Sequence, residues 1–421
     1  MGKRTVVSLL ILILLCVLMI PTLGSRITST SADPPDYWPT SGWQYSTPEE
    51  QGMNSAHLDD MMDYIASQSL PMDSVVIVRH GHVILEEYPN PTVYDQDSRH
   101  DLHSATKSVS SALIGIAIEE GYVDSISHKV LDFFPNRTIA NMSAWKQAIT
   151  LEHLLTMTSG LEWNDSWEFG LWPSDDQVQF VLDRPMAYEP GTVWRYCSGG
   201  VHLLSAIINE TAGDTNAFAT EHLFDPLGIS NYYWNKDPQG LPWGDAWLWM
   251  TPLDMAKFGY LYLHNGMWDG QQIVPAEWVA ESTRSRWWLG GYEGYGYLWW
   301  TNNQTYKYDS YHYDACGAEG QRIFVIPEYD MVVVFTANFD TNGFFEEEDT
   351  LLHNFILLSR IPTFGDLNVD WIVDIFDLVI VATQFGRPPP PISDMRADVN
   401  KDGTVDIFDI VIVSTNYGKT G

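Results

Sequence analysis

Basic residues are scarce in this chain of 421 residues, which has 22 Lys and Arg against 55 Asp and Glu and a formal net charge of −33. A charge of this sign and size repels phosphate backbones, so nucleic-acid binding is excluded. Hydrophobic residues make up 45% of the chain, which is too many for a disordered protein. The length predicts two or three domains with a sizeable core.

Cysteine and long apolar runs are also rare. Cys16 lies in an N-terminal apolar run, so only Cys197 and Cys316 remain, and a small scaffold built from disulfides is excluded. That run follows Lys3 and Arg4 and precedes small residues, a pattern typical of a secretory signal over residues 1–24. It is short for a spanning helix of ~20 residues, and retention as an N-terminal anchor is the alternative. We expect a secreted, extracytoplasmic protein without membrane contact apart from the signal.

Residues 25–41 are expected to be a linker, and residues 42–361 one large mixed unit of the α/β (α+β) class. Apolar runs flank turns at 79–82 and at 327–330, and each pair predicts a β-hairpin. A helix is expected over 344–358, where an acidic first turn suits the positive end of the helix dipole. Strands at both ends around a helix-rich middle predict an antiparallel sheet built from N- and C-terminal strands, flanked by helices, with a helical insertion.

The segment Ser104-Ala105-Thr106-Lys107 leads into an apolar helical stripe. Residues three apart share a helix face, so the Ser104 hydroxyl and the Lys107 amine can meet. The positive end of the helix disfavours an ammonium and lowers the pKa of the lysine. A neutral lysine can take the serine proton, which gives the nucleophile of acyl-transfer chemistry. The alternative is a capping serine beside a surface lysine.

Two further segments carry chemical groups. Tyr196 precedes Ser198 by two positions after a turn, and a phenol near a cation can relay a proton. Gly317 and Ala318 lie beside a strand edge, where small residues let a substrate approach backbone N–H groups that polarise its carbonyl. In isolation, a tyrosine at the edge of the core and a glycine-rich turn are the alternatives.

Together and in this order, the three segments resemble the serine β-lactamase and penicillin-binding-protein-like superfamily. The similarity is greatest to its class C-like branch of esterases, D-amino-acid peptidases and 6-aminohexanoate-dimer hydrolases. Residues 154–161, Leu-Leu-Thr-Met-Thr-Ser-Gly-Leu, resemble the LLTHTSGL signature of that branch. The resemblance implies a β-lactamase-like fold and an acyl-enzyme mechanism. Ser104 would be the nucleophile, Lys107 its general base and Tyr196 the acid/base partner, and the N–H groups of Ser104 and Ala318 would form the oxyanion hole.

Two departures from the family pattern bear on the substrate. Ser198 stands where the family usually has asparagine, as in some amide-hydrolysing relatives. The cationic K-T-G segment is not recognisable, and the nearest stretch, 312–315, holds no lysine or arginine. This argues against a β-lactamase or D-Ala-D-Ala peptidase and favours neutral esters or amides as small-molecule substrates. A non-catalytic scaffold or binding protein on a degenerate hydrolase fold is a further alternative.

Four further residues are expected to contact the substrate. Ser198, Gly317, Trp163 and Trp167 are candidates for substrate binding, with core packing as the alternative for the tryptophans.

The family fold implies that Cys197 and Cys316 approach one cleft. Two buried thiols are the favoured interpretation, and a disulfide is the alternative.

Residues 362–421 are expected to form a second, small all-α unit, and they contain an internal repeat. Segments 366–386 and 398–418 are identical at 13 of 21 positions. Oxygen-bearing residues at loop positions 1, 3, 5, 9 and 12, with a backbone carbonyl at position 7, fit Ca²⁺. The first loop offers Asp366, Asn368, Asp370, Ile372, Asp374 and Asp377, and the second Asp398, Asn400, Asp402, Thr404, Asp406 and Asp409. Trp371 replaces the position-six glycine in the first loop, so its calcium affinity is less certain. Solvated acidic turns are the alternative.

The pair of loops resembles a type I dockerin module, including aspartate as the twelfth ligand. The resemblance implies a cohesin-bearing partner, and a calcium-stabilised terminal cap is the alternative. Calcium is expected only in this tail, and no cofactor is expected for catalysis.

Overall fold

The computed structural model describes residues 37–164, 170–290, 293–302, 311–339 and 346–360, together with Pro35 and, in the tail, residues 373, 375–384, 397, 399 and 404–417. The predicted signal and much of the predicted linker lie outside these residues. Within the described ranges, no helix has the length and apolar character needed to cross a bilayer. A short 3₁₀ turn at Pro39–Ser41 precedes the first strand.

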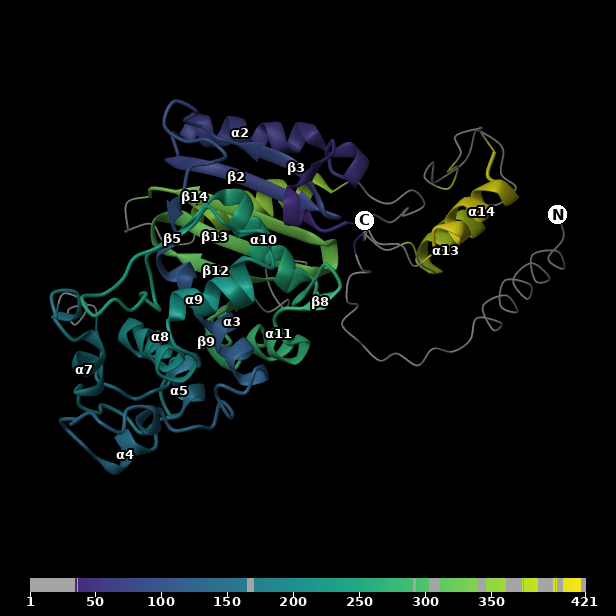
Figure 1. Cartoon of the computed structure of the whole chain (residues 1–421). Coiled ribbons are helices and arrows are strands. Elements are labelled where there is room, and N and C mark those ends of the chain that lie inside the picture. Colours follow the sequence, from purple (N-terminus) through teal and green to yellow (C-terminus); the bar gives the residue numbers. More distant parts are fainter. Residues whose placement is uncertain are drawn as a thin grey trace, which may run out of the picture. The chain divides into compact units, whose positions relative to one another are not determined.

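A nine-stranded sheet forms the centre of the large unit (Figure 1). Its order is β1 (Gln44–Tyr45), β3 (His82–Glu87), β2 (Met72–Arg79), β14 (Met331–Ala337), β13 (Gln321–Ile326), β12 (Tyr313–Gly317), β11 (Trp300–Asn302), β10 (Glu293–Tyr295) and β9 (Trp287–Gly290). All pairs are antiparallel except β1 with β3. Because β2 pairs with β14, strands from the two ends of the unit lie side by side, and the predicted sheet and both hairpins are confirmed.

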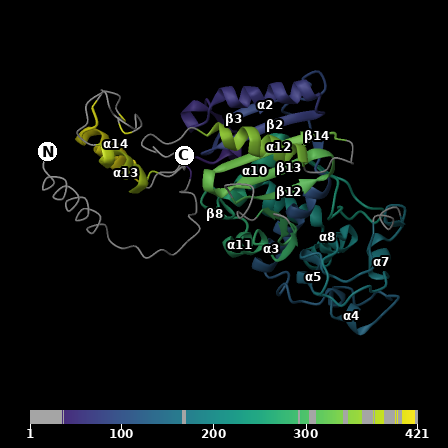
Figure 2. The ribbon, with the colours of Figure 1, turned by 180° about the vertical axis from the view of Figure 1, so that it is seen from behind.

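Helices cover both faces of this sheet (Figure 2). Successive side chains of a strand point to opposite faces, so Val75 and Ile77 of β2 join one core cluster and Val76 and Val78 join the other. The first cluster lies under α2 (Ser55–Gln68) and α12 (Glu346–Leu351). The predicted C-terminal helix is therefore confirmed, although it continues beyond α12 as a π-helical segment (Leu352–Ile356) and a 3₁₀ turn (Leu357–Ser359).

The helical insertion covers the other face. Its helices are α3 (Thr106–Glu119), α4 (Ala144–Gln147), α5 (Leu151–Leu155), α7 (Gln177–Leu182), α8 (Ser198–Ala212), α9 (Thr215–Ala219), α10 (Pro252–Leu263) and α11 (Ala276–Ser282). Short strands β4 (His100–Asp101), β6 (Leu248–Met250) and β5 (Tyr233–Trp234) form a small sheet, and β7 (Met267–Trp268) pairs with β8 (Gln271–Gln272).

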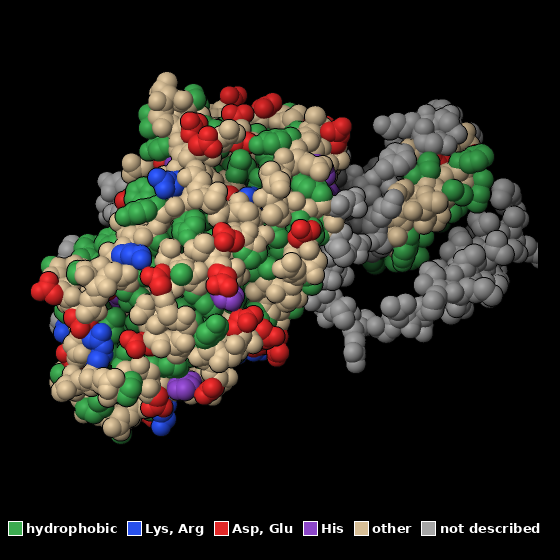
Figure 3. All heavy atoms as spheres, viewed as in Figure 1, with side chains coloured by type: hydrophobic (Ala, Val, Ile, Leu, Met, Phe, Trp, Pro, Cys, Tyr) green, Lys and Arg blue, Asp and Glu red, His purple; other side chains and the backbone are tan. Residues whose placement is uncertain are grey.

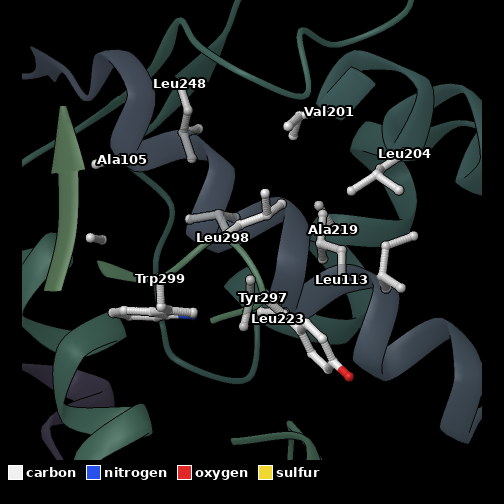
Figure 4. Close-up of a cluster of buried hydrophobic side chains, with 14 of the residues drawn as sticks. Ala105, Leu113, Val201, Leu204, Ala219, Leu223, Leu248, Tyr297, Leu298 and Trp299 are labelled. Carbon is white, nitrogen blue, oxygen red and sulfur yellow. The ribbon is translucent and has the colours of Figure 1, made fainter. Parts of the chain in front are cut away.

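Helix α3 is buried on all sides from Thr106 to Ala117 and packs against α8 and β12. Figure 4 shows Leu113 of α3 and Leu204 of α8 among the buried side chains of this cluster. A helix without a solvent face is held rigidly, so polar side chains at its N-terminus have fixed surroundings.

The tail contains α13 (Ile375–Gln384) and α14 (Ile407–Thr415), which pack on each other and confirm a small helical unit. Both repeats contribute to one core of Val373, Val381, Ala397, Val399, Val405 and Val413. Val379 and Val411 are exposed although each lies in an apolar run of the sequence, because a helix that packs on one face turns the residues of its opposite face toward solvent.

Candidate active site

Ser104 lies in a 3₁₀ turn (His103–Ala105) that runs directly into α3. It is partly exposed, whereas the side chain of Lys107, one turn later, is 2% exposed. Lys107 Nζ lies 2.8 Å from Ser104 Oγ. The structure therefore brings together the predicted nucleophile and base, with only the serine open to solvent.

Two further groups surround the Lys107 amine. Nζ donates a hydrogen bond to the backbone oxygen of Asp245 at 2.8 Å. It also lies 5.0 Å from the centre of the Tyr196 ring. On the same helix, Ser110 donates to Gly244 O at 2.5 Å, so α3 is tied to segment 244–245 at two adjacent points. Sequence reasoning missed this segment, because Gly-Asp resembles an ordinary turn.

Tyr196 is held among aromatic rings. Its ring stacks on the Trp300 ring of β11, with the ring centroids 6.4 Å apart and an angle of 25° between the ring planes. The centroids of the Tyr196 and Trp194 rings are 6.2 Å apart. Ser198 is the first residue of α8 and is buried. The segment from Tyr196 to Ser198 is thus fixed at one end by the sheet and at the other by the helix that packs on α3.

Gly317 ends β12 where the strand meets the segment preceding the nucleophile. A Cβ atom at Gly317 would lie 2.1 Å from Leu102 O, so only glycine permits this approach. Ala318 follows in a 3₁₀ turn (Ala318–Gly320). The segments that carry the Ser104 and Ala318 N–H groups are therefore adjacent, as an oxyanion hole requires.

Three titratable side chains flank these segments. His103 Nε2 lies 3.4 Å from Glu319 Oε2, and His103 Nδ1 lies 3.8 Å from Asp101 Oδ2. Asp101 also accepts the His103 N–H at 2.9 Å. Burial raises the pKa of the Asp101 carboxyl, while the nearby His103 acts in the opposite direction. No motif marked these residues; their only signal was their position next to Ser104 and Ala318.

Over residues 311–317, the described stretch nearest to the place of the family's cationic K-T-G segment, the chain has no lysine or arginine. Burial, together with the nearby Arg322, lowers the pKa of His312 to about 3, so this imidazole is neutral. Arg322 pairs with the buried Asp314, and its second nitrogen lies 3.3 Å from Asp349. Burial raises the pKa of Asp314 to about 6, against the attraction of Arg322. Arg322 therefore forms ion pairs with carboxylates of its own chain.

A cavity of about 420 Å³ borders the segment before Tyr196; its lining is Leu161, Glu162, Trp163, Asn164, Ala187, Tyr188 and Arg195. Trp163 is itself buried and packs against α8, where a Cβ at Gly199 would lie 2.4 Å from its ring. Trp163 thus serves the core and forms a wall of this cavity. Trp167 lies outside the described residues.

Comparisons with known proteins place this geometry in a family. The Beta-lactamase family model matches residues 54–357. The chain belongs to the β-lactamase family. The Dockerin type I domain model matches residues 364–416, so this β-lactamase-family hydrolase fold is followed by a dockerin domain.

Individual relatives of this β-lactamase-family chain are distant. The 6-aminohexanoate-dimer hydrolase of Paenarthrobacter ureafaciens is 23% identical over 300 residues, 62% of this chain and 71% of the relative. A family VIII carboxylesterase has a TM-score of 0.58 at 16% identity, covering 72% of this chain and 97% of that one. An octameric penicillin-binding protein homologue from Pyrococcus abyssi has a TM-score of 0.57 at 21% identity, covering 73% and 77%. The structural matches show the same fold.

The two cysteines are separate thiols. Cys197 and Cys316 are both buried, and no disulfide joins these two described residues, so the favoured interpretation is confirmed and the disulfide alternative is wrong. Burial raises the pKa of the Cys316 thiol well above its ordinary value.

Most of the predicted calcium ligands lie outside the described residues: Asp366, Asn368, Asp370, Ile372, Asp374, Asp398, Asn400 and Asp402. In the described part of the chain, no group of three or more His, Cys, Asp or Glu side chains forms a metal site. Asp377 and Asp409, both at position twelve, are completely buried. Asp409 accepts N–H groups from Val399 at 2.7 Å and Asp406 at 2.8 Å. Buried carboxylates at these positions fit loops that close around a hard cation.

Proposed function

We propose that this chain is a secreted serine hydrolase that cleaves neutral esters or amides through an acyl-enzyme. The observation that carries the proposal is the 2.8 Å separation of Ser104 Oγ and the buried Lys107 Nζ. An amine in a dry site can take the serine proton, and the serine oxygen then attacks the substrate carbonyl carbon. Tyr196, below Lys107, is the partner that relays the proton toward the leaving group.

The N–H groups of Ser104 and Ala318 are the proposed oxyanion donors. Their support is the close approach of β12 to the Ser104 segment at Gly317. Backbone donors fixed by packing stabilise the charge that develops on the carbonyl oxygen without having to reorient.

The proposed substrate class rests on charge and on the relatives. At the described residues of β12 and β13, a substrate carboxylate would lose its water shell without gaining a partner, because His312 is neutral and Arg322 is paired. The relatives include a carboxylesterase and a 6-aminohexanoate-dimer hydrolase, which act on esters and amides by their names. These points favour an esterase or amidase over the alternative of a β-lactamase or D-Ala-D-Ala peptidase. Ser198, Gly317 and Trp163 remain proposed substrate contacts.

The dockerin domain supports a second role, attachment to a cohesin-bearing protein with calcium bound in both loops. Helices α13 and α14 expose Phe376 and Phe408, each 63% accessible, at equivalent positions of the repeat. Figure 3 shows hydrophobic side chains gathered on the surface of these helices. Exposed aromatic side chains of this kind mark protein interaction sites. Secretion, proposed from the N-terminal signal pattern, would place the tail where cohesins occur.

An active-site-directed phosphonate and small aryl esters test the catalytic proposal directly. The phosphonate should label Ser104, and Ser104→Ala should abolish both labelling and turnover. Lys107→Ala should lower kcat on the order of 10³-fold, and the double variant should lose little more, because the two residues act as one proton-transfer unit. If the folded wild-type protein is not labelled by the phosphonate and hydrolyses neither esters nor amides, the alternative of a non-catalytic scaffold is supported instead.

A further inference from the structure

Asp245 lies in the segment between β5 and β6 and follows Gly244, which α3 binds through Ser110. The residue is 4% exposed, and its backbone oxygen accepts the hydrogen bond from Lys107 Nζ at 2.8 Å. Its carboxyl oxygen Oδ1 is buried and has no hydrogen-bond partner within the described residues. The residue that binds the amine of the proposed base through its backbone thus also carries a buried carboxyl oxygen without a hydrogen-bond partner.

A carboxylate without full hydrogen bonding is costly to bury, because it loses its water shell without gaining equivalent partners. Burial accordingly raises the pKa of Asp245, while Lys107 of α3 and His202 of α8 act in the opposite direction. These are the two titratable groups that act on Asp245 from the elements packed around it in the described chain. Such a residue gives the fold little stability, so its placement calls for another role.

His202 is occupied by other partners. Its Nε2 lies 3.3 Å from Asp237 Oδ2, and its Nδ1 accepts the N–H of Gly244 at 3.4 Å. Asp237 also accepts N–H groups of Gln239 and Leu241, both at 2.9 Å. The pair therefore fixes the segment that carries Asp245. Of the two charged groups that act on the Asp245 carboxyl, Lys107 has the larger effect.

We propose that Asp245 is a positioning residue for Lys107, orienting the amine through its backbone oxygen and stabilising the ammonium form through its buried carboxylate. This rests on the proposed function. In the acylation step, Ser104 Oγ bonds to the carbonyl carbon, its proton passes to Lys107 Nζ and the carbonyl electron pair moves to oxygen. The ammonium then gives that proton, relayed by Tyr196, to the leaving alcohol or amine as the C–O or C–N bond breaks and the carbonyl forms again. Asp245 forms no covalent bond in either step. The arrangement corresponds to the third member of a Ser-His-Asp triad.

The variant Asp245→Asn keeps the shape and the backbone oxygen but removes the charge. For a neutral aryl ester we expect kcat to fall on the order of tenfold or more with KM little changed. The acid limb of the pH profile of kcat/KM should move to lower pH by roughly one unit, because the negative charge that favours the ammonium form of Lys107 has been removed. Asp245→Glu should restore the position of the limb. Loss of activity at every pH with an unmoved limb would show a purely structural role and overturn the proposal.

Two measurements complete the test. Asp254→Asn is the matched control, since Asp254 is another buried carboxylate, 3.2 Å from Lys257, and its removal should leave the limb unmoved. The NMR titration of Lys107 in the Ser104→Ala protein needs no turnover, and the midpoint should fall to lower pH when Asp245→Asn is added. If Asp245→Asn does not fold, Asp245→Ser replaces it. If the Lys107 titration shifts but the wild-type protein hydrolyses no ester or amide, this inference stands and the proposed function is refuted. If the wild-type protein is active but the Lys107 titration does not shift, the proposed function stands and this inference is refuted.

Discussion

His103 Nε2 lies 3.4 Å from Glu319 Oε2, and this contact joins the residue before Ser104 to the residue after Ala318. Both residues have a backbone in the left-handed region, with φ of 46° and 63°. Non-glycine residues are held in this region only by their surroundings, and they gather at functional sites. The side-chain bridge therefore connects the two chain segments that carry the proposed oxyanion donors.

Removing this bridge should reduce the rate more than the stability. Glu319→Gln is expected to lower kcat about tenfold, because the Ala318 N–H loses its fixed position relative to Ser104, and to change KM little. A partly exposed contact of this kind contributes at most about 1 kcal/mol to stability, so the melting temperature should hardly change. The control is Glu277→Gln, at an exposed glutamate of α11. Unchanged kcat in Glu319→Gln would show that packing at Gly317 alone positions Ala318.

Substrate charge should decide between ester and β-lactam hydrolysis. Because Arg322 is held by Asp314 and Asp349, the enzyme should prefer neutral aryl esters to penicillin in kcat/KM by about a hundredfold or more. The methyl ester of the same penicillin is a matched substrate without the carboxylate, and it should be the better substrate of the two. Equal or greater activity on the free acid would mean that another cation binds it, and Arg195 of the neighbouring cavity would be the first to replace.

Acid stability should report on His312. Its folded-state pKa of about 3 is below the ordinary value, so its contribution to folding is present above about pH 6.5 and is lost as the pH falls toward 3. The loss is at most about 1.4 kcal/mol per pH unit. Asp314, whose pKa is raised to about 6, acts in the opposite direction between about pH 6 and pH 4.

Replacing His312 separates these two opposing contributions. His312→Asn should keep more of its pH 7 stability at pH 4.5 than the wild-type protein does, as measured by urea unfolding. The same change at exposed His57 of α2 should leave the pH dependence unaltered. Parallel profiles for His312→Asn and the wild type would contradict the assignment.

Calcium removal should unfold the tail and spare catalysis. Each loop offers four carboxylates, which repel one another without metal, and neither repeat alone encloses the shared valine core. Chelation should make residues 366–418 sensitive to protease while ester hydrolysis continues. Asp398→Ala should weaken calcium binding and loosen both halves, whereas Asp394→Ala, outside both loops, should not. A tail equally resistant in chelator and in millimolar calcium would identify the loops as acidic turns.

The sequence by itself determined local pairings and periodic structure. The three-residue spacing of Ser104 and Lys107 on a helix, the hairpin around 327–330 and the repeat in the tail depend on short-range geometry, and a linear pattern records them. The sheet class also followed, because apolar runs at both ends of the unit have to pair with one another to bury their faces.

Tertiary structure alone decided which distant groups meet the reactive pair. Asp245 reaches Lys107 across 138 positions, and Glu319 reaches His103 only because β12 packs against the turn that carries Ser104. It also decided that Arg322 forms an ion pair with Asp314 and that Val379 and Val411 face the solvent. Burial and partner choice depend on every element packed around a side chain, and no local pattern contains that information.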